Sequence, residues 1–241
     1  MQNNNKTKAL CLDAEWVGHP KCKTCAVRSS MLFADLPDEA LDHLLQPVDN
    51  YRFHSRAHLY DQGDAGAYLF TIRSGIVKLE QSMPNGALRV VRLLHAGDVV
   101  GLEALVGNSY HHTAVALGEV DACRIATQVI QDLDKHSPQL HAQLMLRWQK
   151  SLDEADDFIV QLSTGSATAR LARLLLKLSV VANEPFIAPS REDIGAMLGV
   201  TTETASRLMA EFKRRSWVRE ANGQFVSCEC GRLAQLATDM D

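Results

Sequence analysis

Between residues 50 and 130, short apolar runs alternate with turn signals, a pattern typical of antiparallel β-structure. Residues 68–73, 76–79 and 90–94 are three such runs, and Asn85-Gly86 precedes the last of them. Asn-Gly between two strand-like runs is a strong hairpin signal because both residues tolerate the positive φ of a tight turn. Many short strands with regular glycine turns predict an antiparallel roll or barrel for this segment.

From residue 127 onward the hydrophobic period lengthens to three or four residues, which indicates helix. One narrow apolar stripe follows, and we expect a single long helix that forms a homodimer through residues 138–162, with packing on its own domain as the alternative. The acidic residues Asp153, Glu154, Asp156 and Asp157 flank the stripe, and helical geometry is expected to turn most of them to its sides. The stripe consists of Leu140, Leu144, Trp148, Leu152, Ala155, Ile159 and Leu162.

Beyond residue 165 the pattern predicts three shorter helices and a final hairpin. The helices are expected over residues 169–181, 191–198 and 201–215, and the hairpin turns at Asn222-Gly223. The sequence contains no internal repeat. Two short helices followed by a hairpin are the parts of a winged DNA-binding module.

The signals at the ends of these helices are specific. Ser190 and Asp193 have the spacing of a capping box, in which each side chain satisfies a backbone N–H of the other. Gly199 permits a tight turn, and Thr201 is placed to cap the next helix. Two helices joined in this way form a helix-turn-helix.

Three polar residues on the second helix of this motif are candidates for base contacts. Glu203, Ser206 and Arg207 stand at i, i+3 and i+4 and therefore share one face. An Arg donates two hydrogen bonds to guanine, a Glu accepts one from cytosine, and a Ser contacts several base edges. We expect these three residues, with Thr202 beside them, to contact DNA; an exposed Glu203–Arg207 ion pair is the alternative.

The distribution of charge supports a nucleic-acid partner more than the net charge of −4 does. Residues 167–219 carry nine Lys/Arg and five Asp/Glu, a local charge of +4, which leaves −8 for the rest of the chain. A basic module on an acidic body fits binding of double-stranded DNA at one end only. Lys213, with Arg214 and Arg215 after it, is expected to contact phosphates, or only water.

The six cysteines are the second candidate for chemistry. Cys22-x-x-Cys25, in a polar N-terminal arm, is a suitable chelating pair for an iron–sulfur cluster or zinc. Cys228 and Cys230 are expected to face solvent or to pack. The sequence contains no run of about 18 apolar residues, and residues 1–10 lack an apolar signal region, so we expect no membrane span, no secretory signal and a cytoplasmic location.

The chain resembles the CRP/FNR family of bacterial regulators over about residues 30–236. The resemblance rests on the glycines at the turns of the roll, the long helix, and residues 191–207, which read REDIGAMLGVTTETASR. It implies an α+β fold with an N-terminal antiparallel β-roll like that of cyclic-nucleotide-binding domains, a long dimerisation helix and a C-terminal winged helix-turn-helix. The implied domains are a sensory arm (1–30), the β-roll (31–130), the dimerisation helix (131–164) and the DNA-binding domain (165–241).

The Glu-x-x-Ser-Arg pattern of Glu203, Ser206 and Arg207 is similar to that of the FNR branch. It implies that these residues recognise TTGAT-type palindromic half-sites and that the protein is a homodimeric transcription regulator, an activator that works with RNA polymerase. An enzyme is not expected, since the sequence shows no nucleophile–base pair and no Walker-type phosphate loop.

Cys123 lies where the FNR branch has its internal cluster cysteine, so the resemblance implies a [4Fe–4S] cluster and a response to oxygen or redox state. Such a cluster needs three thiolates from the arm in addition to this one. The branch's third arm cysteine, a few residues after the pair, has no counterpart here, since residues 28–32 contain no cysteine. We therefore expect the ligands to be Cys11, Cys22, Cys25 and Cys123, with His19 as the alternative to Cys11.

Cyclic AMP and haem are the alternatives to an iron–sulfur cluster as the ligand of the roll. Family members that bind cyclic AMP place an Arg-Ser pair after a short helix of the roll; residues 110–114 offer Thr113 but no Arg, so we expect no cyclic AMP. His111 and His112 are expected to be exposed or hydrogen-bonded. If they were haem ligands, the protein would be a nitric oxide or carbon monoxide sensor of the same fold. A non-regulatory enzyme or ion-carrying protein that uses the roll is the remaining alternative.

Overall fold

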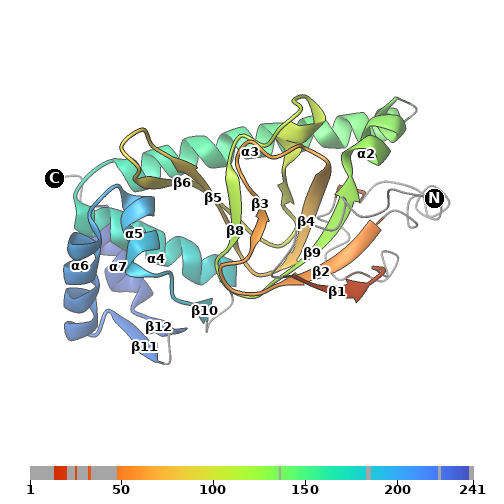
Figure 1. Ribbon diagram of the computed structural model, residues 1–241. Coiled ribbons are helices and arrows are strands. Elements are labelled where there is room, and N and C mark those ends of the chain that lie inside the picture. Colours follow the sequence, from red (N-terminus) through yellow and green to blue (C-terminus); the bar gives the residue numbers. More distant parts are fainter. Residues whose placement is uncertain are drawn as a thin grey trace. The chain divides into compact units, whose positions relative to one another are not determined.

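The computed structural model describes residues 14–20, 25, 32–33, 48–135, 137–182, 186–221 and 224–238. The chain divides into two compact units. One comprises Met1–Glu80 and Leu93–Leu152, and the other Gln81–Arg92 and Asp153–Asp241. Figure 1 labels the helices and strands in chain order.

Two antiparallel sheets form the predicted roll (Figure 1). The five-stranded sheet has the order β1-β2-β9-β4-β7, and the four-stranded sheet has the order β3-β8-β5-β6. The strands of the first are β1 (Ala14–Gly18), β2 (Val48–Phe53), β4 (Tyr68–Ser74), β7 (Val99–Val100) and β9 (Val120–Ala126). Those of the second are β3 (His58–Tyr60), β5 (Val77–Ser82), β6 (Leu88–Leu94) and β8 (Thr113–Ala116).

Strand β1 is an edge strand that the apolar pattern did not predict. It pairs antiparallel with β2, with Trp16 opposite Tyr51. Most of its residues are exposed. A strand without a buried face leaves no apolar alternation in the sequence, so the pattern gave no signal for this strand.

The interior of the roll is closed by aromatic side chains. Phe53, Tyr60, Phe70 and Tyr110 are almost completely buried. The rings of Tyr60 and Tyr110 stack with centroids 3.7 Å apart, and the Tyr110 hydroxyl donates to the Tyr68 carbonyl at 2.6 Å. Burial raises the pKa of Tyr110 to about 12, so its hydroxyl keeps the proton that this hydrogen bond uses.

Two turns show why glycine stands where it does. At Gly75, φ is +87°, and a Cβ atom would lie 2.3 Å from the Glu119 carbonyl oxygen, so no other residue fits. The predicted hairpin between β5 and β6 is confirmed: Gly86 has φ +81°, and the Asn85 side chain accepts from the Ala87 N–H at 3.1 Å.

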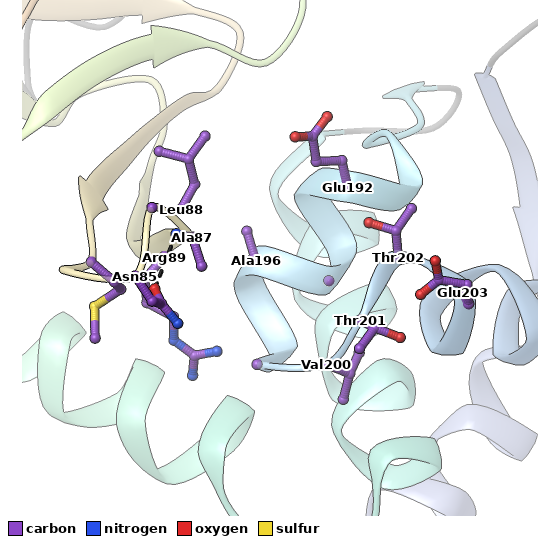
Figure 2. A pocket seen from close by; sticks show the side chains of 14 residues that line it. Asn85, Ala87, Leu88, Arg89, Glu192, Ala196, Val200, Thr201, Thr202 and Glu203 are labelled. Carbon is purple, nitrogen blue, oxygen red and sulfur yellow. Dashed lines mark hydrogen bonds between the residues drawn. The ribbon is translucent and has the colours of Figure 1, made fainter.

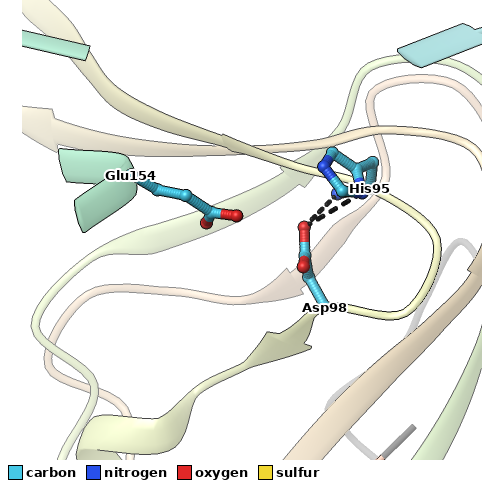
Figure 3. Close-up of side chains that lie close together, drawn as sticks. All are labelled: His95, Asp98 and Glu154. Atoms are coloured by element: carbon cyan, nitrogen blue, oxygen red, sulfur yellow. Dashed lines mark hydrogen bonds and ion pairs between the residues drawn. The ribbon is translucent and has the colours of Figure 1, made fainter. Parts of the chain in front are cut away.

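Asp98, a buried carboxylate, organises the turn before β7. Its Oδ2 accepts the backbone N–H of His95 at 2.8 Å, and the His95 Nδ1 lies 3.3 Å from the same oxygen (Figure 3). Its other oxygen accepts from Lys150. Because Lys150 is on the long helix, this contact fastens that helix to the roll within the first unit.

Three helical segments belong to or follow the roll: the 3-10 helix η3 (Leu102–Leu105), α2 (Thr127–Asp134) and the long α3 (Pro138–Ser163). Helix α3 has the predicted length, but its apolar stripe is not one dimer seam. Leu140, Leu144 and Leu162 are buried within the chain. That part of the prediction is wrong, because one side of α3 packs on its own chain.

The exposed apolar residues of α3 lie on another side. Leu152 and Ile159 keep 58% and 59% of their surface exposed. Asp156, also exposed, is four residues after Leu152 and three before Ile159, so it shares their face instead of a flank. Trp148 and Ala155 are half-buried. The other large exposed apolar residues of the helix are Met145, Leu146 and Val160.

The second unit contains the predicted helices and hairpin. The helices are α4 (Ala167–Ala182), α5 (Arg191–Leu198), α6 (Thr202–Arg214) and α7 (Cys230–Ala237). A three-stranded sheet of order β10-β12-β11 is made from β10 (Phe186–Ile187), β11 (Val218–Ala221) and β12 (Gln224–Cys228). Strand β10 and helix α7 were not predicted: two residues are too few to show a period, and α7 lacks the side-chain cap that marked the equally short α5.

Arg173 of α4 links the ends of two helices in this unit. Its side chain is 9% exposed and donates to the carbonyls of Gln161 and Thr164, at the end of α3, and of Ala237, the last residue of α7. Carbonyls at helix C-termini have no partner within the helix, so one guanidinium satisfies both ends. Among the residues that the structure describes, no helix is long and apolar enough to cross a membrane.

Candidate nucleic-acid interface and metal centre

Helices α5 and α6 are fixed by local hydrogen bonds at the positions predicted. The Ser190 Oγ accepts from the Asp193 N–H at 3.0 Å, and the Asp193 carboxylate accepts from the Ser190 N–H at 3.2 Å. Gly199 ends α5 with φ +64°, and the Thr201 Oγ1 accepts from the Thr204 N–H at 3.2 Å. These contacts build a helix-turn-helix whose second helix begins at Thr202.

The turn between the helices is close-packed. A Cβ on Gly195 would lie 2.8 Å from the Val200 carbonyl oxygen, so a larger residue would push the two helices apart. Ile194 of α5 and Ala205 of α6 are buried. Met197 and Met209 are fully buried too, so the inner faces of both helices are occupied by packing. The outer face of α6 is therefore the one exposed to solvent.

The outer face carries the predicted base-contacting residues. Glu203, Ser206 and Arg207 are all exposed, as is Thr202, and Figure 2 shows Thr202 and Glu203 in the first turn of α6. The backbone N–H at Glu203 and the Thr201 hydroxyl, with a smaller contribution from the charge of Arg207, lower the pKa of Glu203. The carboxylate is thus held in the acceptor form that hydrogen-bonds an amino group.

Thr204 is a residue of this face that the sequence reasoning missed. Its Oγ1 accepts from the Arg207 Nη2 at 3.4 Å and lies 3.2 Å from the Thr201 Oγ1. The signal that was available is its spacing, three residues after the capping Thr201 and three before Arg207. This hydrogen bond to Thr204 orients the Arg207 guanidinium toward the N-terminal end of the helix.

Two basic residues at the end of α6, Lys213 and Arg215, have partners within the chain. The Lys213 Nζ lies 3.1 Å from the Glu220 Oε2 of β11, and Arg191 donates to the same oxygen at 2.7 Å. Arg215 lies 2.7 Å from Glu211. Burial raises the pKa of Glu220, but the hydrogen bonds from Arg191 and Lys213 outweigh burial, and the net shift is downward. The two ion pairs of Glu220 thus join strand β11 of the hairpin to α5 and α6.

Two of the four predicted cluster cysteines lie in the described part of the chain. Cys123, on β9, is 4% exposed and belongs to an apolar cluster with Leu69, Ile125 and others. Cys25 is half-buried and packs against that cluster. Cys11 and Cys22 lie outside the described residues. Cys25 and Cys123 thus border one apolar cluster of the roll.

His19, the alternative to Cys11, lies beside the same sheet. Its Nδ1 is 3.2 Å from the Val48 carbonyl oxygen and 3.8 Å from the Asp49 carboxylate. Val48 is in β2, which pairs with β9 so that Asn50 faces Cys123. The ring edge that carries Nδ1 is thus directed at the backbone of β2.

The segment considered for cyclic AMP and haem has its own contacts. His111 is exposed, and the Nδ1 of half-buried His112 is 3.7 Å from Glu103 of η3. The Thr113 Oγ1 accepts from the Gln62 N–H at 3.0 Å. The hydroxyl that would stand for the Ser of a cyclic-nucleotide site is therefore already engaged by the backbone.

Comparison with known proteins agrees with this architecture. Residues 51–137 match the cyclic nucleotide-binding domain family, and residues 169–236 match the Crp-like helix-turn-helix domain family. The chain is 30% identical over 226 residues to the fumarate and nitrate reduction regulatory protein of Escherichia coli K12, which covers 90% of both chains. It is 28% identical over 214 residues to the protein of the same name from Vibrio cholerae, which covers 86% of this chain and 85% of that one.

Solved structures of regulators share the fold. FixK2 from Bradyrhizobium japonicum superposes with a TM-score of 0.70 at 22% identity over 80% of this chain and 99% of that chain. A CRP-family transcriptional regulator from Thermus thermophilus gives 0.68 at 21% identity over 79% and 98%. The fold and the capped helix-turn-helix define a DNA-binding transcription regulator. The chain belongs to the CRP/FNR family, and its relatives are regulators, not enzymes.

Proposed function

We propose that the protein is a transcription regulator that responds to oxygen or redox state and recognises TTGAT-type palindromic half-sites. The observation that carries the DNA part is the exposed face of Glu203, Ser206 and Arg207 on a helix whose other side is buried. Arg207 is to pair with guanine and Glu203 with the amino group of cytosine, while Ser206 and Thr202 contact neighbouring edges. Lys213 and Arg214 are to contact phosphates at the end of the same helix.

A homodimer through α3 would bring two such faces to one site. Two half-sites read from the same side of DNA are about one helical turn, roughly 34 Å, apart, so palindromic recognition needs two copies. The exposed Met145, Leu152 and Ile159 recur every seven residues on α3 and supply an apolar surface for the second copy. As an activator in the cytoplasm, the dimer would act on RNA polymerase.

We propose that the redox response comes from a [4Fe–4S] cluster held by Cys11, Cys22, Cys25 and Cys123. The support is that Cys25 packs against the apolar cluster of buried residues to which Cys123 belongs. Thiolates are the donors that iron–sulfur clusters take, so the donor type fits. When bound, the cluster supplies an oxygen-labile centre; the chain supplies the thiolates and an apolar wall that limits water.

Each segment of the chain is proposed to have one role. The arm (1–30) and the β-roll (31–130) are to sense, the helix (131–164) to dimerise, and residues 165–241 to bind DNA. The roll is proposed to act without cyclic AMP, since residues 110–114 lack an Arg to pair with the cyclic phosphate.

Anaerobic purification with iron and sulfide analysis tests the proposal. Four iron and four sulfide per chain, and a broad absorption shoulder that disappears in air, are expected for a [4Fe–4S] cluster. A sharp Soret band would instead identify a haem sensor. Binding of a TTGAT palindrome by the anaerobic protein, against the same duplex with the guanines replaced, tests the DNA part independently.

A further inference from the structure

A second pair of thiols, separate in sequence from the cysteines assigned above, lies at the junction of β12 and α7. Cys228 is the last residue of β12, and Cys230 is the first of α7. Their Sγ atoms are 3.1 Å apart. Cys228 is half-buried and Cys230 is exposed, so a small dissolved oxidant has direct access to one of the two thiols.

The backbone holds the two thiols together. Glu229, the residue between them, has φ −76° and ψ 76°, close to an inverse γ-turn, which folds the chain back over one residue. Its N–H donates to the Trp217 carbonyl at 2.9 Å, and its own carbonyl accepts from Leu233 at 2.9 Å. Leu233 is fully buried, so the junction is anchored on both sides.

The geometry is that of a dithiol ready to close. A disulfide needs an S–S separation of about 2.05 Å and Cα atoms within roughly 7 Å of each other. A turn over one residue meets the second condition, and the Sγ atoms at 3.1 Å are already in contact. Bond formation therefore requires a short approach of the two sulfurs and no rearrangement of the strand or helix.

We propose that Cys228 and Cys230 form a reversible disulfide when a peroxide reaches the protein. The sulfur of exposed Cys230 attacks one peroxide oxygen, the O–O bond breaks, and a sulfenic acid and one water are produced. Cys228 then attacks that sulfur, the S–O bond breaks, and the oxygen leaves as a second water. The two thiols lose two electrons and two protons in total, and hydrogen peroxide is reduced to two waters.

Trp217 connects the thiol site to helix α6 of the same unit. The Trp217 ring packs edge-on against Phe212 of α6, with centroids 5.1 Å apart, and its backbone carbonyl holds Glu229. The guanidinium of Arg232, two residues after Cys230, lies over the same ring at 5.4 Å. Closing the disulfide changes the surroundings of this indole, so its fluorescence is a second reporter.

Peptide mapping tests the proposal on the full-length protein. Trypsin cuts after Arg219 and Arg232, so residues 220–232 form one peptide that holds both cysteines and no other cleavage site. After treatment with hydrogen peroxide and digestion without reductant, this peptide is expected to lose the mass of two hydrogens and to regain it with dithiothreitol. Cys228→Ser and Cys230→Ser are each expected to abolish the loss, and Cys123→Ser to retain it.

Tryptophan fluorescence gives the independent readout. A reversible change on oxidation is expected in the wild type and is expected to be absent in Cys230→Ser and in Trp217→Phe. The proposal is overturned if peroxide leaves the peptide 220–232 as two thiols, converts Cys230 to a sulfinic acid, or links either cysteine to another peptide. It is also overturned if Cys228→Ser still shows the reversible mass loss.

Discussion

Arg207 and Thr204 lie one turn apart on α6, and the Arg207 Nη2 donates a hydrogen bond to the Thr204 Oγ1 at 3.4 Å. The bond is long, Arg207 is exposed and Thr204 is half-buried. The hydrogen bond therefore orients the guanidinium and leaves its other N–H groups available. An arginine held in this way has its remaining donors available for a base edge, which makes it the sharpest point at which to test recognition.

Replacing Arg207 with Ala should weaken binding to a TTGAT-type palindrome by about 1–3 kcal/mol and relax discrimination at the guanine, because one bidentate contact is lost. The measurement is a titration of specific and random duplexes at fixed salt. Arg214→Ala is the matched control, expected to weaken both duplexes alike. Equal loss on both duplexes for Arg207→Ala would show that it contacts only phosphates.

The iron site gives the second prediction. Cys25→Ser and Cys123→Ser should each abolish anaerobic iron incorporation, because each removes one of the thiolates, while Cys228→Ser, outside the proposed set, should keep the iron content of the wild type. Iron and sulfide are measured per chain. If Cys11→Ser retains both, the fourth ligand is not Cys11, and loss of iron in His19→Ala would identify the replacement.

Asp156 supports a prediction about association. It lies between the exposed Leu152 and Ile159 on one face of α3, so a parallel dimer through that face would bring it near its own copy. Removing the charge with Asp156→Asn should strengthen dimerisation by on the order of 1 kcal/mol, the repulsion of two unit charges a few ångströms apart in water.

Sedimentation of the cluster-free protein measures this effect. A shift of about fivefold in the dimerisation constant is expected for Asp156→Asn. Asp157→Asn is the control, because residue 157 points well away from the face of Leu152 and Ile159. The same shift in both variants would mean that the charge acts at long range and that this face is not the interface.

The ion pairs of Glu220 give a pH-dependent prediction. The folded protein lowers the pKa of this carboxyl below its ordinary value of 4.5, so the stabilisation is complete above that value and is lost as the pH falls through the folded pKa. Glu220→Gln should therefore reduce the free energy of unfolding by about 1–2 kcal/mol at pH 7, and the difference should shrink below about pH 4.

Urea unfolding at a series of pH values tests this sign. The control is Glu192→Gln, an exposed glutamate of α5, which should change stability little at any pH. A difference for Glu220→Gln that grows as the pH falls would contradict the assignment of its stabilisation to the charged form.

The helix-turn-helix could be predicted from the sequence almost residue for residue. Its determinants are local: Ser190 with Asp193, Gly199 at the turn, and Thr201 with Thr204 are all contacts between residues three or four apart. The hairpin at Asn85-Gly86 is local in the same sense. Local contacts depend on backbone geometry alone, so a residue type at a given spacing is enough to predict them.

Other features depend on packing between distant segments. The apolar stripe of α3 predicted a helix of the right length. Only packing on the roll decides that Leu140 and Leu144 are buried while Leu152 is exposed. Periodicity identifies an apolar face of a helix but not the surface against which that face packs. Likewise a basic run at the end of α6 does not reveal that Lys213 pairs with Glu220 on β11.

The sequence by itself determined the antiparallel strands of the roll, the capped helices and the shared face of Glu203, Ser206 and Arg207, since these follow from period and spacing. Only the tertiary structure decided what surrounds the thiols. Cys25 packs against the apolar cluster to which Cys123 belongs, and the Sγ atoms of Cys228 and Cys230 lie 3.1 Å apart because the backbone turns at Glu229. Burial and approach depend on the path of the whole chain, and no spacing of residue types contains that path.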